Sequence, residues 1–214
     1  MSLDRITLPL AEAAAACYAP GAVPTWQSSL RLVHVFHSVV LDTNCFAFEG
    51  TTDWQEWAVD FFALQVPVFD HPILGAVHAG FLLDVDAVIG NIIAKMSSLG
   101  WPPFYVTGHS KGAGEAILCH ALLKALGHPP LATRAFEPPR VGGEKLKAFI
   151  ASDDLLWTQT WNSDGVDLVT LVPDGPTWCH DGTQLRLQVP DAYGIAQKHR
   201  IPAVLEALRK EPPA

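Results

Sequence analysis

The feature that most constrains the fold is a short apolar run, a tight glycine turn and a helix-forming stretch in immediate succession. The run FYVT at 104–107 is rich in residues that favour strands, and GHSKG at 108–112 carries two glycines. The residues that follow have helical spacing, with one buried face expected at Ala113, Ile117, Ala121 and Leu122. A strand that turns sharply into a helix is the central unit of a parallel sheet, so the sequence predicts an α/β fold.

Further strand-like and helix-like segments surround this unit. We expect strands over 31–41, 44–50, 134–137 and 155–161, and helices over 8–18, 78–99 and 201–210. In the second helix apolar residues recur at threes and fours from Phe81 to Met96, and Gly100 and Pro102 then stop it. The alternation predicts one domain over 1–214, built on a mostly parallel central sheet with helices on both faces.

Composition excludes several classes of function. The 214 residues carry a net charge of −8, and their 14 lysines and arginines are scattered, which argues against nucleic-acid binding and attraction to anionic membranes. No apolar run approaches the roughly 20 residues of a membrane-spanning helix, so we expect no stable membrane insertion. The first residues lack a basic leader with an apolar stretch. We expect a soluble protein, cytoplasmic if the chain is complete and secreted if a leader has been removed.

No metal or organic cofactor is expected. The four cysteines are dispersed and have the spacing of neither a disulfide framework nor a zinc site. His34 and His37 would point to opposite faces of a strand, so they are not expected to share a metal ion. No residue pattern indicates an oligomeric state.

Gly108, His109, Ser110, Lys111 and Gly112 form the pattern G-x-S-x-G. In this pattern the serine lies on a sharp strand-to-helix turn, and side chains at the glycine positions would collide with the neighbouring strand and helix. The strand-like run before it and the helical stretch after it are the context that such a turn requires. Ser110 is therefore a candidate nucleophile.

A serine hydroxyl is a poor nucleophile at neutral pH, so it needs a base, usually histidine, and a carboxylate that orients the imidazole. His120 and His128 lie on the helix after the turn or at its end, too close along the chain to return over Ser110. His180 and His199 remain as candidates for the base.

Two acids compete for the orienting carboxylate. Asp167 in VDLVTLVP follows a strand-like stretch, where a loop would bring it to the active edge of the sheet. Asp164 is its nearest rival.

The candidate residues belong to a larger set of ordered motifs, which are FEGTTDWQEWAVDF, VHAGF, VTGHSKGAGEA, PPRVGG, DLVTLVP, WCHDG and QKHRIPAVLEAL. In this order and spacing, over roughly residues 10–209, the sequence resembles the class 3 lipases, the fungal-type triacylglycerol lipase family. The resemblance implies the α/β-hydrolase fold and the hydrolysis of carboxylic esters through an acyl-enzyme, without a cofactor. Acylglycerols or other lipid esters would be the substrates, and long triacylglycerols are the family expectation. Because this chain is short for the family and lacks loops around its C-terminal half, a shallow acyl pocket and short- or medium-chain esters are the alternative.

Carried over by position, the resemblance makes Ser110 the nucleophile, Asp167 the orienting carboxylate and His199 the general base. This chain has two extra residues before Asp167, which keeps Asp164 open as the acid. His180 matches a structural histidine of the family's H-x-G turn, and His78 in VHAGF likewise implies an architectural role.

The resemblance also places the oxyanion hole, the pair of donors that stabilises the charge on the tetrahedral intermediate. These donors would be the backbone amides of Thr51 and Lys111, and the Thr51 hydroxyl usually contributes as well. Removing such a donor costs on the order of 3 kcal/mol of transition-state stabilisation.

The segment after Thr51 occupies the family's lid position, a short helix that covers the serine in water. We expect Trp54, Trp57 and His109 at this lid and the substrate pocket; the alternative is that both tryptophans belong to the core. The family usually has Arg in the place of Glu49 and Leu in the place of Lys111. These departures alter the polarity expected at the pocket mouth.

Two other functions remain open at the level of the sequence. One is a phospholipase that acts on polar lipids. The other is a non-catalytic protein of the hydrolase fold that binds a lipid or a partner, which would predict an incomplete set of catalytic side chains.

Overall fold

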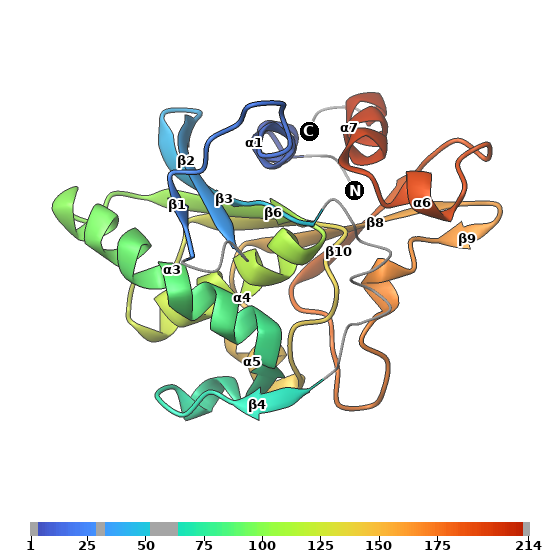
Figure 1. Cartoon of the computed structure of the whole chain (residues 1–214). Coiled ribbons are helices and arrows are strands. Elements are labelled where there is room, and N and C mark those ends of the chain that lie inside the picture. Colours follow the sequence, from blue (N-terminus) through green and yellow to red (C-terminus); the bar gives the residue numbers. More distant parts are fainter. Residues whose placement is uncertain (1–3, 29–32, 52–63, 212–214) are drawn as a thin grey trace.

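The computed structural model describes residues 4–28, 33–51 and 64–211, and its centre is an eight-stranded mixed sheet between two layers of helices (Figure 1). Seven strands follow the order β1-β2-β3-β6-β7-β8-β10, and β9 pairs with β8. Their bounds are Trp26–Gln27 (β1), His34–Val40 (β2), Thr43–Phe48 (β3), Phe104–His109 (β6), Ala132–Phe136 (β7), Leu155–Asn162 (β8), Gly165–Val166 (β9) and Thr183–Gln188 (β10).

The strands β3, β6, β7, β8 and β10 run parallel, whereas β1 and β2 add an antiparallel edge. The turn between β2 and β3 places Leu41 and Asp42 at φ of 49° and 61°. Two successive positive φ angles are the geometry of a two-residue hairpin turn that matches the strand twist. The predicted mostly parallel sheet with helices on both faces is confirmed.

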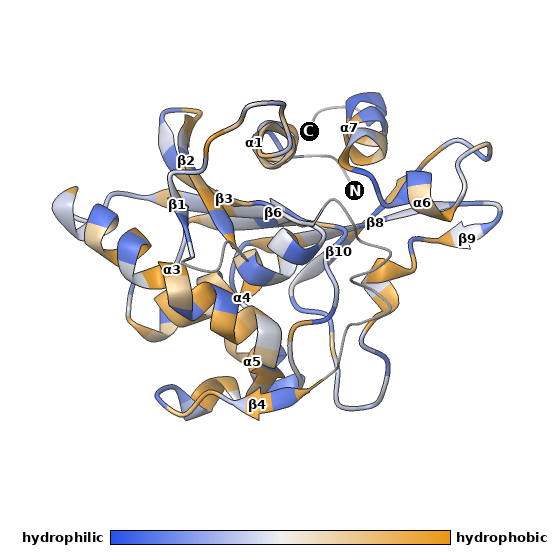
Figure 2. Cartoon of the chain, viewed as in Figure 1, coloured by the Kyte–Doolittle hydropathy of each residue, from blue (hydrophilic) through white to orange (hydrophobic). Residues whose placement is uncertain are grey.

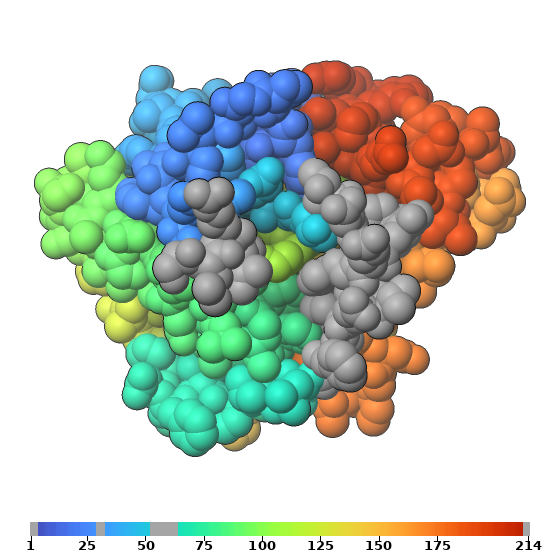
Figure 3. Space-filling model, in the orientation of Figure 1, coloured from blue at the N-terminus to red at the C-terminus, as the bar shows by residue number. Residues whose placement is uncertain are grey.

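Each face of the sheet carries its own apolar core. One face is covered by α1 (Thr7–Ala16) and α7 (Ile201–Lys210), and the other by α3 (Ala79–Ser98), α4 (Lys111–Ala125) and α5 (Glu144–Ile150). The helix α7 is polar on its outer side and apolar toward the sheet (Figure 2). The helices α1 and α7 contact each other, and in the space-filling view the N-terminal and C-terminal parts of the described chain lie side by side (Figure 3).

The predicted helices over 8–18, 78–99 and 201–210 correspond closely to α1, α3 and α7. His78 caps α3, because its Nδ1 accepts a hydrogen bond from the amide of Phe81 at 3.4 Å. This contact agrees with the architectural role expected for His78.

The elements that the sequence did not predict are mostly short. They are β1, β9, β10, α5, the hairpin of β4 (Gln65–Pro67) and β5 (Ala76–His78), α6 (Ile195–Lys198), and the 3₁₀ helices η1 (Pro72–Leu74) and η2 (Val169–Leu171). Most of them contain too few residues to establish a period. None of the helices in the described ranges is both long and apolar enough to cross a membrane.

Candidate active site

Ser110 lies at the turn between β6 and α4, in a backbone conformation that few side chains adopt, with φ 59° and ψ −127°. Its amide donates to the carbonyl of Phe136 on the neighbouring strand at 2.9 Å. A Cβ atom at Gly108 would collide with the backbone of Gly112, and one at Gly112 would collide with Phe48. Both glycines are therefore required for the close approach of strand and helix, as the G-x-S-x-G pattern predicts.

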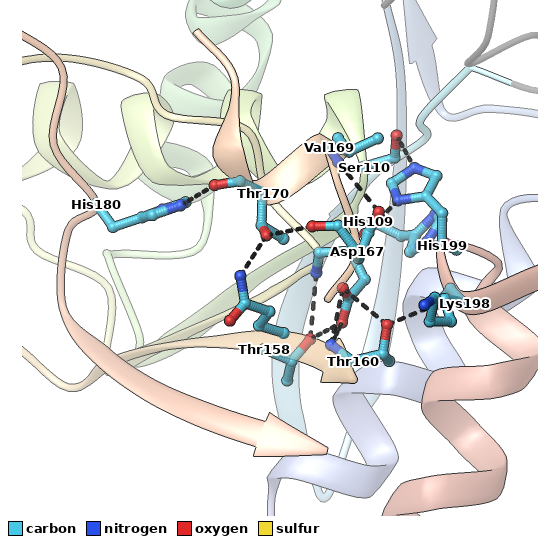
Figure 4. Close-up of polar contacts among 12 residues, drawn as sticks. His109, Ser110, Thr158, Thr160, Asp167, Val169, Thr170, His180, Lys198 and His199 are labelled. Atoms are coloured by element: carbon cyan, nitrogen blue, oxygen red, sulfur yellow. Dashed lines mark hydrogen bonds and ion pairs between the residues drawn. The ribbon is translucent and has the colours of Figure 1, made fainter. Parts of the chain in front are cut away.

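A continuous hydrogen-bonded chain joins Ser110, His199 and Asp167 (Figure 4). Nε2 of His199 lies 2.7 Å from Oγ of Ser110, and its Nδ1 lies 2.6 Å from Oδ2 of Asp167. All three side chains are buried, with at most 1% of each residue exposed. The residues come from three separate segments: the turn after β6, the loop between β9 and η2, and the residue that follows α6.

The protonation states of these three side chains follow from their contacts. Burial is the largest single influence on the pKa of Asp167 and raises it, but His199, Glu137 and the amide of Val169 act in the opposite direction and hold this pKa below its usual value. An ionised Asp167 accepts a hydrogen bond from Nδ1 of His199. Nε2 is then the acceptor that faces the hydroxyl of Ser110, which is the arrangement that general-base activation needs.

Asp164 does not take part in the hydrogen bonds that join Ser110, His199 and Asp167. It is exposed, and its amide donates to Oδ1 of Asn162 at 3.1 Å. The amide of Asp167 instead donates to the carbonyl of Thr160 on β8 at 3.0 Å, which turns its carboxylate toward His199. The geometry thus assembles Asp167, and not Asp164, with the serine and the histidine.

His180 occupies a different position from His199. Its ring stacks on Trp157 with the centroids 3.8 Å apart, and its Nε2 donates to the carbonyl of Thr170. Thr170 in turn donates from its hydroxyl to the carbonyl of Asp167 at 2.7 Å. His180 therefore supports the loop of Asp167 through Thr170, on the side away from His199 (Figure 4), in agreement with the structural role expected for it.

His109 was expected at the lid and the substrate pocket, and the structure places it differently. Its ring is buried, Nε2 donates to the carbonyl of His199 at 2.6 Å, and Nδ1 lies 3.0 Å from the hydroxyl of Tyr18. Burial lowers the pKa of His109 to about 3, and the neighbouring His199 acts in the same direction. His109 is thus a neutral link to the His199 backbone beneath the serine. Trp54 and Trp57 lie outside the described residues, so their role at a lid stays a prediction.

The segment that carries the first expected oxyanion donor lies against the nucleophile. A Cβ atom at Gly50 would be 3.2 Å from Cβ of Ser110, and the Gly50 amide donates to the hydroxyl of Tyr18 at 3.0 Å. Thr51 is the next residue. The second expected donor, the amide of Lys111, is in the first turn of α4, where backbone N–H groups point out of the helix and favour a negative charge.

The Lys111 side chain points away from this amide into an acidic pair. Its ammonium lies 2.6 Å from Oδ2 of Asp84 on α3 and also pairs with Glu115 one turn further along α4. Glu115 is fully buried, and burial raises its pKa well above the usual value. The charged residue in place of the family's Leu is thus neutralised inside the protein.

The other departure, Glu49, is also paired. Its carboxylate lies 2.5 Å from Nδ1 of His34, while His37 contacts Asn44 through Nε2 at 2.9 Å. Within the described part of the chain no three His, Cys, Asp or Glu side chains come close enough together to hold a metal ion.

Two residues at the site had no assigned role from the sequence. Tyr18, in the turn after α1, contacts both Gly50 and His109. Glu137, directly after β7, is fully buried against Asp167. The only signal for Glu137 was an acidic residue at the end of the strand expected over 134–137, and for Tyr18 there was none.

Comparison with known proteins agrees with the geometry. The family model described as Lipase (class 3) matches residues 45–174, more than half of the chain. A lipase from Rhizomucor miehei is 27% identical over 182 residues, covering 72% of this chain and 48% of its own length. The chain therefore spans about half the length of that relative.

Solved structures show the same fold. A fungal lipase superposes with a TM-score of 0.73 at 18% identity, covering 90% of this chain and 83% of its own. A triacylglycerol lipase whose catalytic centre is a serine protease triad gives 0.66 at 21% identity, covering 86% and 78%. The expected α/β-hydrolase fold is confirmed. Since the family model covers the serine turn, the oxyanion segment and Asp167, the chain belongs to the class 3 lipase family.

Proposed function

We propose that this chain is a carboxylic ester hydrolase that cleaves lipid esters through an acyl-enzyme formed on Ser110. The observation that carries the proposal is the buried chain of hydrogen bonds from Ser110 through His199 to Asp167. A polar chain of this kind is costly to bury and is the arrangement that activates a serine hydroxyl. The class 3 lipase family and the structurally similar triacylglycerol lipase support acylglycerols as the substrate class.

The reaction would follow from the roles of the three side chains. Oγ of Ser110 attacks the ester carbonyl carbon while its proton passes to Nε2 of His199. The amides of Thr51 and Lys111 stabilise the oxyanion, and His199 then gives the proton to the departing alkoxide as the carbon–oxygen bond breaks. Water attacks the acyl-enzyme by the same route and releases the fatty acid. Asp167 stays ionised throughout and stabilises the imidazolium.

The test is hydrolysis of p-nitrophenyl esters from acetate to palmitate, in buffer and with emulsified lipid, by the wild type and by Ser110→Ala. We expect turnover by the wild type, and its loss by at least about a thousandfold in the variant with an unchanged circular dichroism spectrum. Ser98→Ala is a matched control, because Ser98 is exposed at the end of α3 and should not affect turnover. Substantial activity in Ser110→Ala would reject Ser110 as the nucleophile.

A fluorophosphonate probe separates catalysis from simple binding. Covalent labelling of wild-type protein that is lost in Ser110→Ala supports the hydrolase, whereas a folded protein that never labels supports a non-catalytic binder. A lipid panel with headgroup and chain length varied then tests the substrate class. Activity confined to phospholipids would replace the acylglycerol proposal with a phospholipase.

A further inference from the structure

Glu137 is a second buried acid behind the proposed triad. It follows β7 directly, between the neighbouring strands β6 and β8, and is fully buried. Its φ of 53° lies in the left-handed region, which costs about 1–2 kcal/mol for a residue with a Cβ atom. A strained backbone that holds a buried acid next to the proposed reaction centre points to a role beyond packing.

The contacts of Glu137 leave one of its oxygens available to hold a proton. Oε1 accepts from the hydroxyl of Thr158 at 2.9 Å and from the amide of Thr160 at 3.1 Å. Oε2 shares that amide at 3.1 Å and lies 3.3 Å from the hydroxyl of Thr160, which makes a shorter bond of 2.9 Å to the carbonyl of Lys198. Because a hydroxyl has only one proton to donate, Oε2 receives little from Thr160.

Glu137 and Asp167 meet at Thr160, whose amide donates to both carboxyl oxygens of Glu137 at 3.1 Å and whose carbonyl accepts from the amide of Asp167 at 3.0 Å. Two buried carboxylates held at one residue repel each other when both are ionised, and a hydrogen bond between them requires a proton on one of the two. Asp167 faces His199 and accepts from Val169, which favours its ionised form. None of the ion pairs among the described residues includes Glu137. Burial and the charge of Asp167 raise the pKa of Glu137 well above its usual value.

We propose that Glu137 is a positioning residue for the hydrolase: as a protonated acid it donates a hydrogen bond from Oε2 to Asp167 and holds that carboxylate toward His199. The inference rests on the proposed function, because its catalytic consequence passes through Asp167 and His199. Two donors on β8, the hydroxyl of Thr158 and the amide of Thr160, fix the acid in place through three hydrogen bonds. A neutral donor also draws charge away from Asp167 without adding a second anion to the buried site.

The charged and titratable groups around this acid come from three segments. Asp167 faces Glu137, and His199 is connected to it through its hydrogen bond with Asp167. His109 packs on His199 with the ring centroids 5.0 Å apart. Lys198 approaches through its backbone carbonyl, while its ammonium binds Asn162 at 2.9 Å and the carbonyl of Gly165 at 3.2 Å. Among these charged and titratable groups of the described residues, Asp167 is the one that acts on Glu137 directly.

The protonation state of Glu137 can be measured without any ester hydrolysis. In protein labelled with carbon-13 at the glutamate carboxyl, the resonance absent from Glu137→Gln belongs to this residue. We expect it at the position of a protonated acid at pH 7. In Asp167→Asn, where the neighbouring charge is gone, Glu137 should ionise at a lower pH. A carboxylate resonance at pH 7 in wild-type protein would overturn the proposal, whether or not the protein hydrolyses esters.

The catalytic consequence is measured on the pH profile of kcat/KM, whose acid limb reports protonation of the base in the free enzyme. Glu137→Gln keeps a neutral donor of the same shape, so its acid limb should stay within about 0.3 pH units of wild type. Glu137→Gly removes the donor at a backbone position that suits glycine. Its acid limb should move up by about 0.5–1 pH unit, because Asp167 then carries more charge toward the imidazolium, and kcat should fall about tenfold or more.

These two variants separate positioning from packing. A packing role alone would lower stability in Glu137→Gly and leave the acid limb where it is in wild type, which would overturn the proposal. A downward shift in Glu137→Gln would mean that the wild-type residue is an anion, which also overturns it. If the wild type hydrolyses no ester, the proposed function fails, and the carboxyl resonance alone decides whether Glu137 donates a proton to Asp167.

Discussion

Nε2 of His109 donates to the backbone carbonyl of His199 at 2.6 Å, so the residue before the serine holds the loop of the proposed base. Because His109 is neutral and Nε2 carries its proton, Nδ1 must accept from the hydroxyl of Tyr18 at 3.0 Å. The oxygen of that hydroxyl accepts from the amide of Gly50 at 3.0 Å. One hydrogen-bonded chain thus connects the expected oxyanion segment to the base, beneath the nucleophile.

Tyr18→Phe should therefore lower catalysis more than substrate binding. The change leaves the Gly50 amide and Nδ1 of His109 without their shared partner, which costs about 1–3 kcal/mol of stability and loosens the segment before Thr51. We expect kcat to fall about tenfold with KM nearly unchanged, measured on a p-nitrophenyl ester. Tyr193→Phe is the control, since it removes a hydroxyl that bonds Glu206 instead. Wild-type kcat in Tyr18→Phe would contradict the link.

His199→Ala and His180→Ala should be compared side by side. Loss of His199 removes the acceptor 2.7 Å from Oγ of Ser110, so kcat should fall by at least about a thousandfold in a folded protein. Loss of His180 removes the contact with Trp157 and Thr170, so it should lower the melting temperature and affect kcat only modestly. If only His180→Ala inactivates the folded enzyme, the assignment of the base is wrong.

The sequence was most informative where the determinants are local. The turn around Ser110 is predictable from five consecutive residues, because each glycine lies at a point where another backbone segment comes too close for a side chain. The helix α3 is predictable from its period, and the parallel sheet from the alternation of strands and helices. The hairpin of β4 and β5 was not, since three-residue strands carry no period.

The rest of the site depends on contacts between distant parts of the chain. Ser110 and His199 are separated by 89 residues, and only the family resemblance selected His199 over His180. The resemblance already carried Asp167 over as the acid, but the backbone bond to β8 that turns its carboxylate toward His199 is not revealed by any residue pattern. His109 was expected at the pocket, but its ring contacts Tyr18, which is 91 residues away in the sequence.

Lys111→Leu, which restores the residue usual in the family, should destabilise this protein. The lysine is the shared cation of Asp84 and Glu115, and its removal leaves two acids facing each other in a largely buried site. We expect a loss on the order of 3 kcal/mol in the free energy of unfolding by urea. Adding Asp84→Asn and Glu115→Gln should recover most of it, because no unpaired charge remains. The folded single variant should keep kcat within about threefold, since the expected oxyanion donor is the backbone amide.

Unchanged stability in Lys111→Leu would mean that the two acids are not held by the lysine. A large loss of kcat in the folded single variant, restored neither by temperature nor by the added changes, would instead assign the lysine side chain to catalysis.

Asp181→Asn should stabilise the protein increasingly as the pH rises from 5 to 8. Asp181 is 1% exposed, neither carboxyl oxygen has a hydrogen-bond partner among the described residues, and burial raises its pKa to about 8. Between its unfolded and folded pKa values the native protein keeps a proton that the unfolded chain has released. Stability from this group is therefore complete at low pH and is lost as the pH rises toward 8, by up to about 1.4 kcal/mol per pH unit.

An asparagine does not titrate, so the difference in unfolding free energy between the variant and wild type should grow with pH, measured by urea denaturation at pH 5, 6.5 and 8. Asp164→Asn, at an exposed position, should show a flat difference over the same range. A flat difference for Asp181→Asn as well would mean that Asp181 titrates alike in the folded and unfolded chain, which would require solvent or a partner at a carboxyl group that the fold encloses.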